Sequence, residues 1–242
     1  MSFFNKKSSF NPFELIGTDI HSHILPGIDD GSKSMAQSIE MAKGINDFGF
    51  RKIITTPHVI WDYYHNTVDN IYKGFEFLKM ELKKNNCDIE IEVAAEYMLD
   101  YEFKENISKT KLLSFGRKYL LFELSFLDPP DFFSDITFNL QVEGYNLVFA
   151  HPERYEYYQR DFKQYETLNA KGIYFQINYG SLLGAYGHQT KNTAEKMIRK
   201  NMVEFIGTDL HKPQQLKSFK KLQHNKHLKR LIDSGNLLNH TL

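Results

Sequence analysis

The sequence has only one cysteine, Cys87, among its 242 residues, so it cannot form an internal disulfide. A chain without disulfides fits a reducing compartment. Net charge is also lacking, because 30 Lys and Arg residues balance 30 Asp and Glu residues. This balance gives no electrostatic reason to expect nucleic acid or an anionic membrane as the main partner. Any phosphate that the protein handles must therefore be held by a local group of side chains.

Long apolar runs are absent too. No segment approaches the roughly 18 apolar residues of a membrane span, and the opening MSFFNKKSSFNPFELIG lacks the apolar core of a signal peptide. We therefore expect a cytoplasmic protein that does not insert into membranes. The proportions of hydrophobic residues (41%) and charged residues (25%) are close to the globular average. We expect one domain over residues 1–242, with residues 1–14 as a loose N-terminal arm.

The apolar pattern predicts a parallel sheet. Short apolar runs alternate with longer segments of helical period, as in βα units. Strands are predicted at Ile16 to His21, Lys52 to Thr56, Ile89 to Ala95, Tyr119 to Glu123, Leu147 to Ala150, Gly172 to Ile177 and Val203 to Gly207. Helices are predicted at Ser34 to Gly49, Thr67 to Lys84, Asp131 to Glu143, Phe162 to Ala170, Thr190 to Lys200 and Gln214 to Leu231.

Almost every predicted strand ends in a side chain that can bind a metal ion. In parallel βα folds, ligand chemistry gathers at the carboxyl ends of the strands. The strand-end residues are His21, His23, His58, Glu96, Glu123, His151, Asp209 and His211. A row of separate coincidences at one edge of a sheet is improbable. We therefore expect these side chains to meet.

Spacing supports a metal site after the first strand. His21 and His23 are two residues apart, so in an extended segment both imidazoles point to the same face. The next turn adds Asp29 and Asp30, which either extend the site or serve an ordinary turn. With Asp30 included, the candidate ligands are five imidazoles and four carboxylates. One mononuclear site needs fewer, so a cluster of two or three ions is expected.

Several of these residues also have simpler interpretations. Glu96 and Glu123 each follow an apolar strand, where a carboxylate is costly to bury unless it is paired or coordinates metal, so a buried salt bridge is the alternative for each. Arg154 has the fork geometry to bind phosphate or carboxylate, or it is an ordinary surface arginine. The loop of residues 178–188 contains three glycines but matches no phosphate-binding fingerprint.

Together these motifs resemble the polymerase-and-histidinol-phosphatase (PHP) superfamily, and within it the metal-dependent protein-tyrosine phosphatases of bacterial capsule and exopolysaccharide operons. The matching stretches, in family order, are DIHSHILPGIDDG (19 to 31), TTPH (55 to 58), AAE (94 to 96), FEL (122 to 124), AHPERY (150 to 155) and GTDLH (207 to 211). The resemblance implies a distorted TIM-like (β/α)7 barrel with its active site at the carboxyl ends of the strands. It also implies three divalent metal ions, most often Mn²⁺, with iron or zinc as alternatives.

The resemblance assigns the ligands to three ions. The first ion would be held by His21, His23, Glu96 and Asp209, the second by Glu96, Glu123 and His151, and the third by Asp30, His58 and His211. Glu96 would then bridge two ions, and Asp29 falls just outside the ligand set. Catalytic roles are implied for Arg154, Asp209 and His211. Substrate binding is implied for Arg154 and for Lys212, which stands where relatives often have a second arginine.

The activity implied is hydrolysis of phosphotyrosine by attack of a metal-bridged hydroxide on phosphorus. A tyrosyl leaving group has a pKa of about 10, far below that of a serine alcohol, which favours phosphotyrosine over phosphoserine. The residue six positions after Cys87 is Val93, not the arginine that a cysteine-dependent phosphatase needs. The aromatic segment Trp61, Tyr63, Tyr64 and His65 could receive a tyrosyl ring or simply pack.

The substrate expected from the resemblance is a phosphotyrosine protein, the C-terminal tail of a bacterial tyrosine kinase that controls polysaccharide synthesis and export. The alternative enzyme is a small-molecule phosphomonoesterase of the same superfamily, similar to histidinol-phosphate phosphatases. An amidohydrolase or nuclease, and a non-catalytic binding module that keeps the metals, are further alternatives. The oligomeric state is left open.

Overall fold

The computed structural model describes residues 10–242, and its strands run parallel. The strands are β1 (Thr18–Asp19), β2 (Lys52–Thr55), β3 (His58–Val59), β4 (Glu90–Val93), β5 (Glu96–Met98), β6 (Tyr119–Glu123), β7 (Asn146–Ala150), β8 (Tyr174–Asn178) and β9 (Phe205–Gly207). They form one sheet in the order β1-β2-β4 and another in the order β3-β5-β6-β7-β8-β9. The residues of each sheet pair in parallel register throughout.

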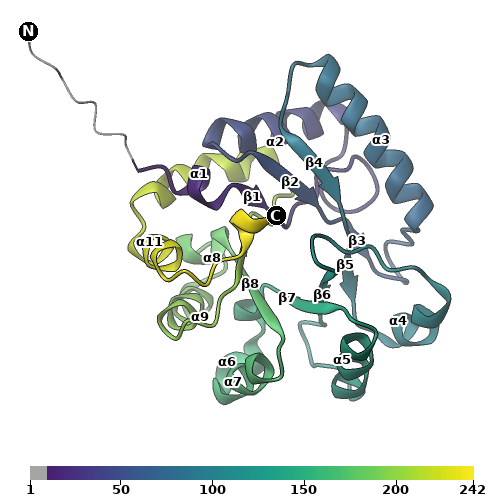
Figure 1. Cartoon of the computed structure of the whole chain (residues 1–242), viewed down its shortest axis with the longest axis vertical. Helices are drawn as coiled ribbons and strands as arrows, with labels where there is room; N and C mark the ends of the chain where they lie inside the picture. The colour runs from purple at the N-terminus through teal and green to yellow at the C-terminus, as the bar shows by residue number, and fades with distance from the viewer. Residues whose placement is uncertain (1–9) are drawn as a thin grey trace, which may run out of the picture.

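The two sheets are parts of one barrel. Only two residues separate β2 from β3, and only two separate β4 from β5, so each pair acts as one interrupted strand that leaves one sheet and joins the other. The ring closes through a parallel bridge between Ser22 and Leu210 and through the Asp209 N–H, which donates to the His21 carbonyl at 2.8 Å. Figure 1 shows the strands around a centre with helices outside. The expected distorted barrel of seven βα units is confirmed.

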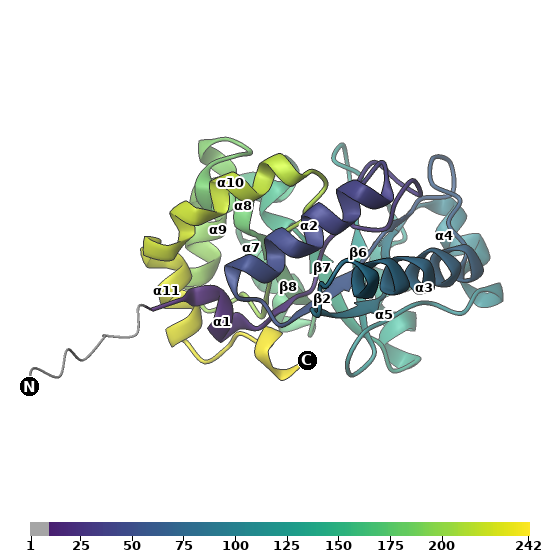
Figure 2. The same ribbon diagram turned by 90° about the horizontal axis from the view of Figure 1, so that it is seen from above.

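Helices cover the outside of the barrel. They are α1 (Pro12–Ile16), α2 (Met35–Phe48), α3 (Val68–Lys84), α4 (Tyr101–Asn106), α5 (Phe133–Val142), α6 (Glu156–Arg160), α7 (Lys163–Ala170), α8 (Tyr179–Leu183), α9 (His188–Arg199), α10 (Leu216–Phe219) and α11 (Lys226–Asp233). Short 3-10 turns include η2 (Pro152–Arg154). In Figure 2, α10 lies beside α2, where Leu216 packs over Gly44. Among residues 10–242, no helix combines the length and the apolarity that crossing a membrane requires.

Two predicted elements differ from the structure near the chain ends. Residues 1–9 of the expected arm lie outside the described residues, but Pro12–Ile16 form α1, which Asn11 caps and which buries Phe13 completely. The single helix expected from Gln214 to Leu231 is wrong, since α10 and α11 are separate. Asn225 takes an extended conformation and its side chain accepts hydrogen bonds from two backbone N–H groups of α11, so it starts a new helix.

The core is divided between the outside and the inside of the barrel. The larger apolar cluster lies between the strands and the outer helices. A smaller cluster gathers buried side chains from around the ring: Ile20, Ile54, Ala94, Phe115, Tyr119, Leu121, Val148, Ala150 and Phe205. Leu242, at the C-terminus, packs against this inner cluster, and the C-terminus lies near the centre of the ring in Figure 1. Apolar residues therefore occupy the inside of the barrel, and the polar side chains gather at the carboxyl ends of its strands.

Candidate metal centre

Four side chains meet where β1 and β9 end. Nε2 of His21 lies 3.1 Å from Oε2 of Glu96 and 3.6 Å from Oδ1 of Asp209. Nε2 of His23 lies 3.5 Å from the same Glu96 oxygen and 3.6 Å from the same Asp209 oxygen. All four residues are buried. Because both imidazoles present Nε2 to the same two carboxylates, this group has the arrangement needed to hold one cation.

Glu96 also belongs to a second group. Its Oε1 lies 3.2 Å from Nε2 of His151, and its Oε2 lies 3.1 Å from Nδ1 of His58. Glu123 faces the same two histidines, at 2.9 Å from Nδ1 of His58 and 3.9 Å from Nε2 of His151. Glu96 therefore lies in the middle of the cluster, within 3.5 Å of nitrogens from four histidines.

A third group lies closer to solvent. Oδ1 of Asp30 is 3.5 Å from Nε2 of His58 and 3.4 Å from Nε2 of His211. His58 thus turns one ring nitrogen toward Glu96 and Glu123 and the other toward Asp30. The nine candidate ligands named from the sequence are all brought together in these three groups. Three sets of side chains each offer ligand atoms close enough to share an ion: His23, His58 and His211; His21, His23 and Glu96; and His58, Glu96 and Glu123.

The donor set fits divalent metal ions. Several buried polar atoms of the cluster have polar neighbours at 2.9–3.2 Å but no partner with the geometry of a hydrogen bond, among them Nδ1 of His58, Oε1 of Glu96 and Oε1 of Glu123. Buried polar groups are rarely left unsatisfied unless an ion or water completes them. A mixture of imidazole and carboxylate ligands suits Mn²⁺, iron and zinc. A cation placed among these atoms would satisfy all three.

The side chains of the cluster shift one another's pKa values and so determine one another's protonation states. Burial opposes protonation of His21, yet the carboxylates of Glu96 and Asp209 raise its pKa to about 9. Burial and the neighbouring imidazoles of His211 and His58 lower the pKa of His23 to about 4. Burial opposes ionisation of Glu96, but the His21 and His58 rings hold its pKa well below the usual range. His23 and Glu96 are therefore in the states that metal ligands need, whereas His21 must release a proton.

Further side chains orient the ligands from behind. Oε1 of Gln176 lies 2.7 Å from Nδ1 of His21, and Oδ2 of Asp29 lies 2.9 Å from Nδ1 of His23. Such partners fix the ring orientation and the tautomer of a metal-binding histidine. Asn178 donates from Nδ2 to Oδ2 of Asp209 at 2.6 Å. The sequence reasoning missed Gln176 and Asn178. The available signal was a pair of polar residues, two apart, at and just beyond the end of the predicted strand Gly172 to Ile177, for which no ionisable candidate was named.

Two ligands take an unusual backbone conformation. His151 has φ 37° and Asp209 has φ 49°, both in the left-handed region that residues other than glycine seldom adopt. Each follows shortly after a barrel strand, β7 and β9 respectively. Such conformations persist where the surrounding structure fixes them, and they gather at functional sites. The left-handed conformation changes the direction of the chain just after β7 and β9, at the residues whose side chains join the metal cluster.

Arg154, at the end of η2, lies at the edge of the cluster. Its Nη1 is 3.3 Å from Oδ2 of Asp209. The guanidinium carbon lies over two aromatic rings, 4.8 Å from the ring centre of Phe126 and 4.3 Å from that of Tyr186. Contact with two rings restricts the guanidinium, and its N–H groups that do not face Asp209 can bind an anion. The sequence reasoning missed both rings because each lies on a loop far from Arg154 in the chain.

A cavity of about 400 Å³ opens over the metal groups. Its walls include Tyr64, Met98, Phe126, Arg154 and Tyr186. The ring of Tyr64 stacks on that of His58, with 5.7 Å between ring centres and 13° between ring planes. The cavity therefore combines charged groups at its base with apolar and aromatic side chains around them.

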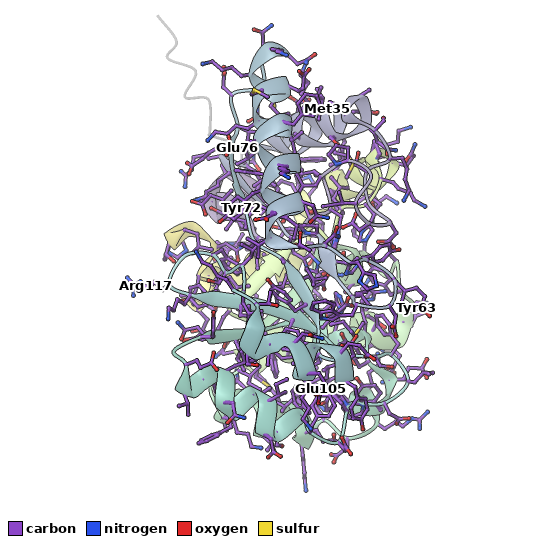
Figure 3. All side chains as sticks on the ribbon, turned by 90° about the vertical axis from the view of Figure 1, so that its right-hand side faces the viewer. Met35, Tyr63, Tyr72, Glu76, Glu105 and Arg117 are labelled. Atoms are coloured by element: carbon purple, nitrogen blue, oxygen red, sulfur yellow. The ribbon has the colours of Figure 1, made fainter. Side chains whose placement is uncertain are left out.

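The other sequence candidates lie away from this cavity. Tyr63 is 80% exposed and points outward at the rim of the molecule in Figure 3, on the side opposite to Arg117, which precedes β6. Trp61 lines a separate hollow. Lys212 is exposed and is not among the residues that line the cavity. The glycine-containing segment 178–188 forms α8 and then a turn that carries Tyr186 to the guanidinium.

Gly207 allows the close packing behind His21. A Cβ at this position would lie 2.6 Å from Cβ of His21 and 3.0 Å from Nε2 of Gln176. Replacing Gly207 by alanine is therefore expected to lower the free energy of unfolding by about 1–3 kcal/mol. It should also push the His21 ring away from Glu96 and weaken metal binding. Urea unfolding and the metal content of the purified variant measure the two effects.

Gly74 provides a matched control for this substitution. It lies within α3, and a Cβ built there meets nothing within 4 Å. Gly74→Ala is expected to raise the free energy of unfolding by up to about 1 kcal/mol, because alanine favours the helix. Equal stability of the Gly207→Ala and Gly74→Ala proteins would contradict the packing argument.

Comparison with known proteins identifies the family. A family model described as capsular polysaccharide synthesis, CpsB/CapC, matches residues 17–231. The tyrosine-protein phosphatase YwqE of Bacillus subtilis is 34% identical over 194 residues, which is 80% of this chain and 76% of that protein. The putative tyrosine-protein phosphatase CapC of Staphylococcus aureus is 29% identical over 194 residues, again 80% of this chain and 76% of that protein.

Solved structures agree with this match. A chain from the crystal structures of YwqE from Bacillus subtilis and CpsB from Streptococcus pneumoniae, described as unique metal-dependent tyrosine phosphatases, superimposes with a TM-score of 0.78 at 30% identity, covering 93% of this chain and 94% of that chain. Histidinol phosphate phosphatase from Lactococcus lactis shares the fold, with a TM-score of 0.57 at 14% identity over 88% of this chain and 93% of that one. The chain belongs to the CpsB/CapC family of capsular polysaccharide synthesis proteins.

Proposed function

We propose that the protein is a metal-dependent protein-tyrosine phosphatase that acts in capsular polysaccharide synthesis. The observation that carries the proposal is the buried cluster centred on Glu96, which shares one cavity with the stacked guanidinium of Arg154. The cluster can hold cations, and the arginine can hold a phosphate. The names of the relatives supply the class of substrate.

We assign the ligands as the family resemblance implies. His21, His23, Glu96 and Asp209 would hold one ion; Glu96, Glu123 and His151 a second; and Asp30, His58 and His211 a third. Mn²⁺ is the ion that we propose. The contacts of Glu96 with His21 and His151 and of Asp30 with His211 support this division. His58 lies between the second and third groups, because its Nδ1 is 2.9 Å from Glu123 and its Nε2 is 3.5 Å from Asp30. When bound, the ions supply Lewis-acid stabilisation of phosphoryl oxygens and lower the pKa of water.

The chain's own residues bind and orient the substrate. Arg154, restricted by its two aromatic neighbours, would pair with phosphoryl oxygens through the N–H groups that do not face Asp209. Tyr64 and Met98 line the same cavity and offer an apolar surface to the tyrosyl ring. Walls of this kind also exclude water around the reacting phosphate. No covalent phosphoenzyme is needed, and Cys87 is buried, with the pKa of its thiol raised by burial.

The proposed partner is a phosphotyrosine protein, and we infer that it is the C-terminal tail of a bacterial tyrosine kinase. The membership in a capsule-synthesis family supports this partner. A preference for phosphotyrosine follows from leaving-group chemistry, because a phenol with a pKa of about 10 departs more readily than an alcohol.

Hydrolysis of a phosphotyrosyl peptide by metal-stripped protein tests the proposal. We expect no turnover without metal and recovery on addition of Mn²⁺. A phosphoseryl peptide of the same sequence should be cleaved at least about a hundredfold more slowly, because its leaving group is the poorer one. Phosphate release measures both rates.

Two outcomes would contradict the proposal. If Mn²⁺, iron and zinc all fail to restore activity on the phosphotyrosyl peptide, the tyrosine-phosphatase assignment is wrong. If the protein instead hydrolyses histidinol phosphate faster than the peptide, it is a small-molecule phosphatase of the same superfamily.

A further inference from the structure

A second hollow adjoins the metal cavity. It has a volume of about 350 Å³ and lies over the start of α9 and the outer side of α6. Phe126, Arg154 and Tyr186 line both this hollow and the metal cavity. The two spaces are therefore neighbours on either side of one stacked triplet. A ligand whose phosphate pairs with Arg154 has only to pass this triplet to reach the second hollow.

Phe126, Arg154 and Tyr186 lie between the two hollows, and one of them is accessible to solvent. The Phe126 side chain is 46% exposed although its ring stacks on Tyr155, with 5.0 Å between ring centres. Leu127, the next residue, is 85% exposed. The loop after β6 thus offers an apolar edge between the two hollows.

The lining of the second hollow suits a peptide main chain. Beyond the triplet it is formed by the neutral polar side chains of Gln159, Gln189 and Thr190, together with Glu156, Gly187 and His188. Nε2 of Gln159 donates to the Glu153 carbonyl at 2.7 Å and to Oγ1 of Thr190 at 3.3 Å, which leaves its Oε1 to accept from a ligand. Amide and hydroxyl groups match the N–H and C=O groups of a peptide, which also carry no net charge.

We propose that this hollow is a subsite that binds the peptide segment next to the phosphotyrosine. The inference rests on the proposed function. Continuity with the metal cavity supports it, since the residues that flank a phosphotyrosine whose phosphate pairs with Arg154 can pass directly into this hollow. A free phosphate ester would fill the first cavity alone. Binding in the second hollow would therefore distinguish a phosphotyrosine protein from a small phosphate ester.

Filling the hollow tests this proposal. Gln189 is exposed on the first turn of α9 and lies in the lining, so Gln189→Trp should occupy part of the space. Phosphate release is measured with a phosphotyrosyl peptide and with free phosphotyrosine, both with Mn²⁺ present. The ratio of the two kcat/KM values, peptide over free phosphotyrosine, should fall by about tenfold or more, mainly through a higher KM for the peptide.

Gln164 supplies the matched control. It is exposed on α7 and lines neither hollow, so Gln164→Trp should keep the ratio of the unsubstituted protein. An unchanged ratio in Gln189→Trp would overturn the subsite. If Gln189→Trp does not fold, the unsubstituted protein still decides the question. Its kcat/KM should rise as flanking residues are added to phosphotyrosine, and equal values along the series would overturn the subsite.

The design separates the two proposals. If the unsubstituted protein does not hydrolyse phosphotyrosine in either form, the proposed function itself fails. If it hydrolyses both forms but the ratio does not respond to the substitution or to peptide length, the function stands and only the subsite is wrong.

Discussion

Replacing Glu96 with glutamine is expected to abolish turnover by removing metal from the protein. Glu96 is fully buried, and its two oxygens lie within 3.5 Å of nitrogens from His21, His23, His58 and His151. A neutral amide keeps the volume but removes the charge that balances these groups. We expect kcat/KM on a phosphotyrosyl peptide to fall by more than about a thousandfold. Metal content of the purified variant should fall with it.

Glu92→Gln is the matched control for the Glu96 substitution. Glu92 lies on β4, four residues earlier, and its Oε1 is 2.6 Å from Nζ of Lys52, outside the metal cluster. This partly exposed ion pair is worth little to stability, so the control should keep both metal and activity. If folded Glu96→Gln retained full metal content and full turnover, the central place of Glu96 in the site would be refuted.

The pattern of the sequence predicts much of the barrel. β6 forms over the predicted Tyr119 to Glu123, because this apolar run has the length of a strand and is buried on both faces, as the central strands of parallel sheets are. The predicted third strand, in contrast, is interrupted. Ala94 and Ala95 separate β4 from β5, and the strand changes sheet there. The position of such a break depends on how the neighbouring strands pair when the barrel closes. The pattern of apolar residues along one strand carries no information about that pairing.

The ligands of the site were easier to predict than the residues around them. Imidazoles and carboxylates at strand ends are uncommon in an apolar context, so they signal chemistry by residue type alone. Gln176, a neutral amide, carries no such signal, although it lies 2.7 Å from the His21 ring. Phe126 and Tyr186 resemble any other aromatic residue until the fold brings them to Arg154. The sequence shows which residues can bind metal, whereas the structure shows what holds them in place.

Replacing Arg154 with alanine is expected to lower activity without removing metal. Arg154 contacts Asp209 through Nη1 at 3.3 Å but belongs to none of the groups that can share an ion. Loss of one charged donor that stabilises a transition state commonly costs about 10²–10³ in rate. We expect kcat/KM on a phosphotyrosyl peptide to fall by about this factor, with both a lower kcat and a higher KM. Metal content should stay at the level of the unsubstituted protein.

Arg154→Lys separates the charge from the shape of the group. Lysine keeps the positive charge but lacks the planar fork that stacks between Phe126 and Tyr186. If the stacked plane matters, the lysine variant should recover only a small part of the lost activity. Arg117 is exposed just before β6 and lines neither hollow, so it gives the control, and Arg117→Ala should be fully active. Full activity of Arg154→Ala would show that Arg154 does not bind the phosphate. Loss of activity together with the metal would show instead that the contact of Arg154 with Asp209 supports the metal site, and would contradict the expected separation of metal content from activity.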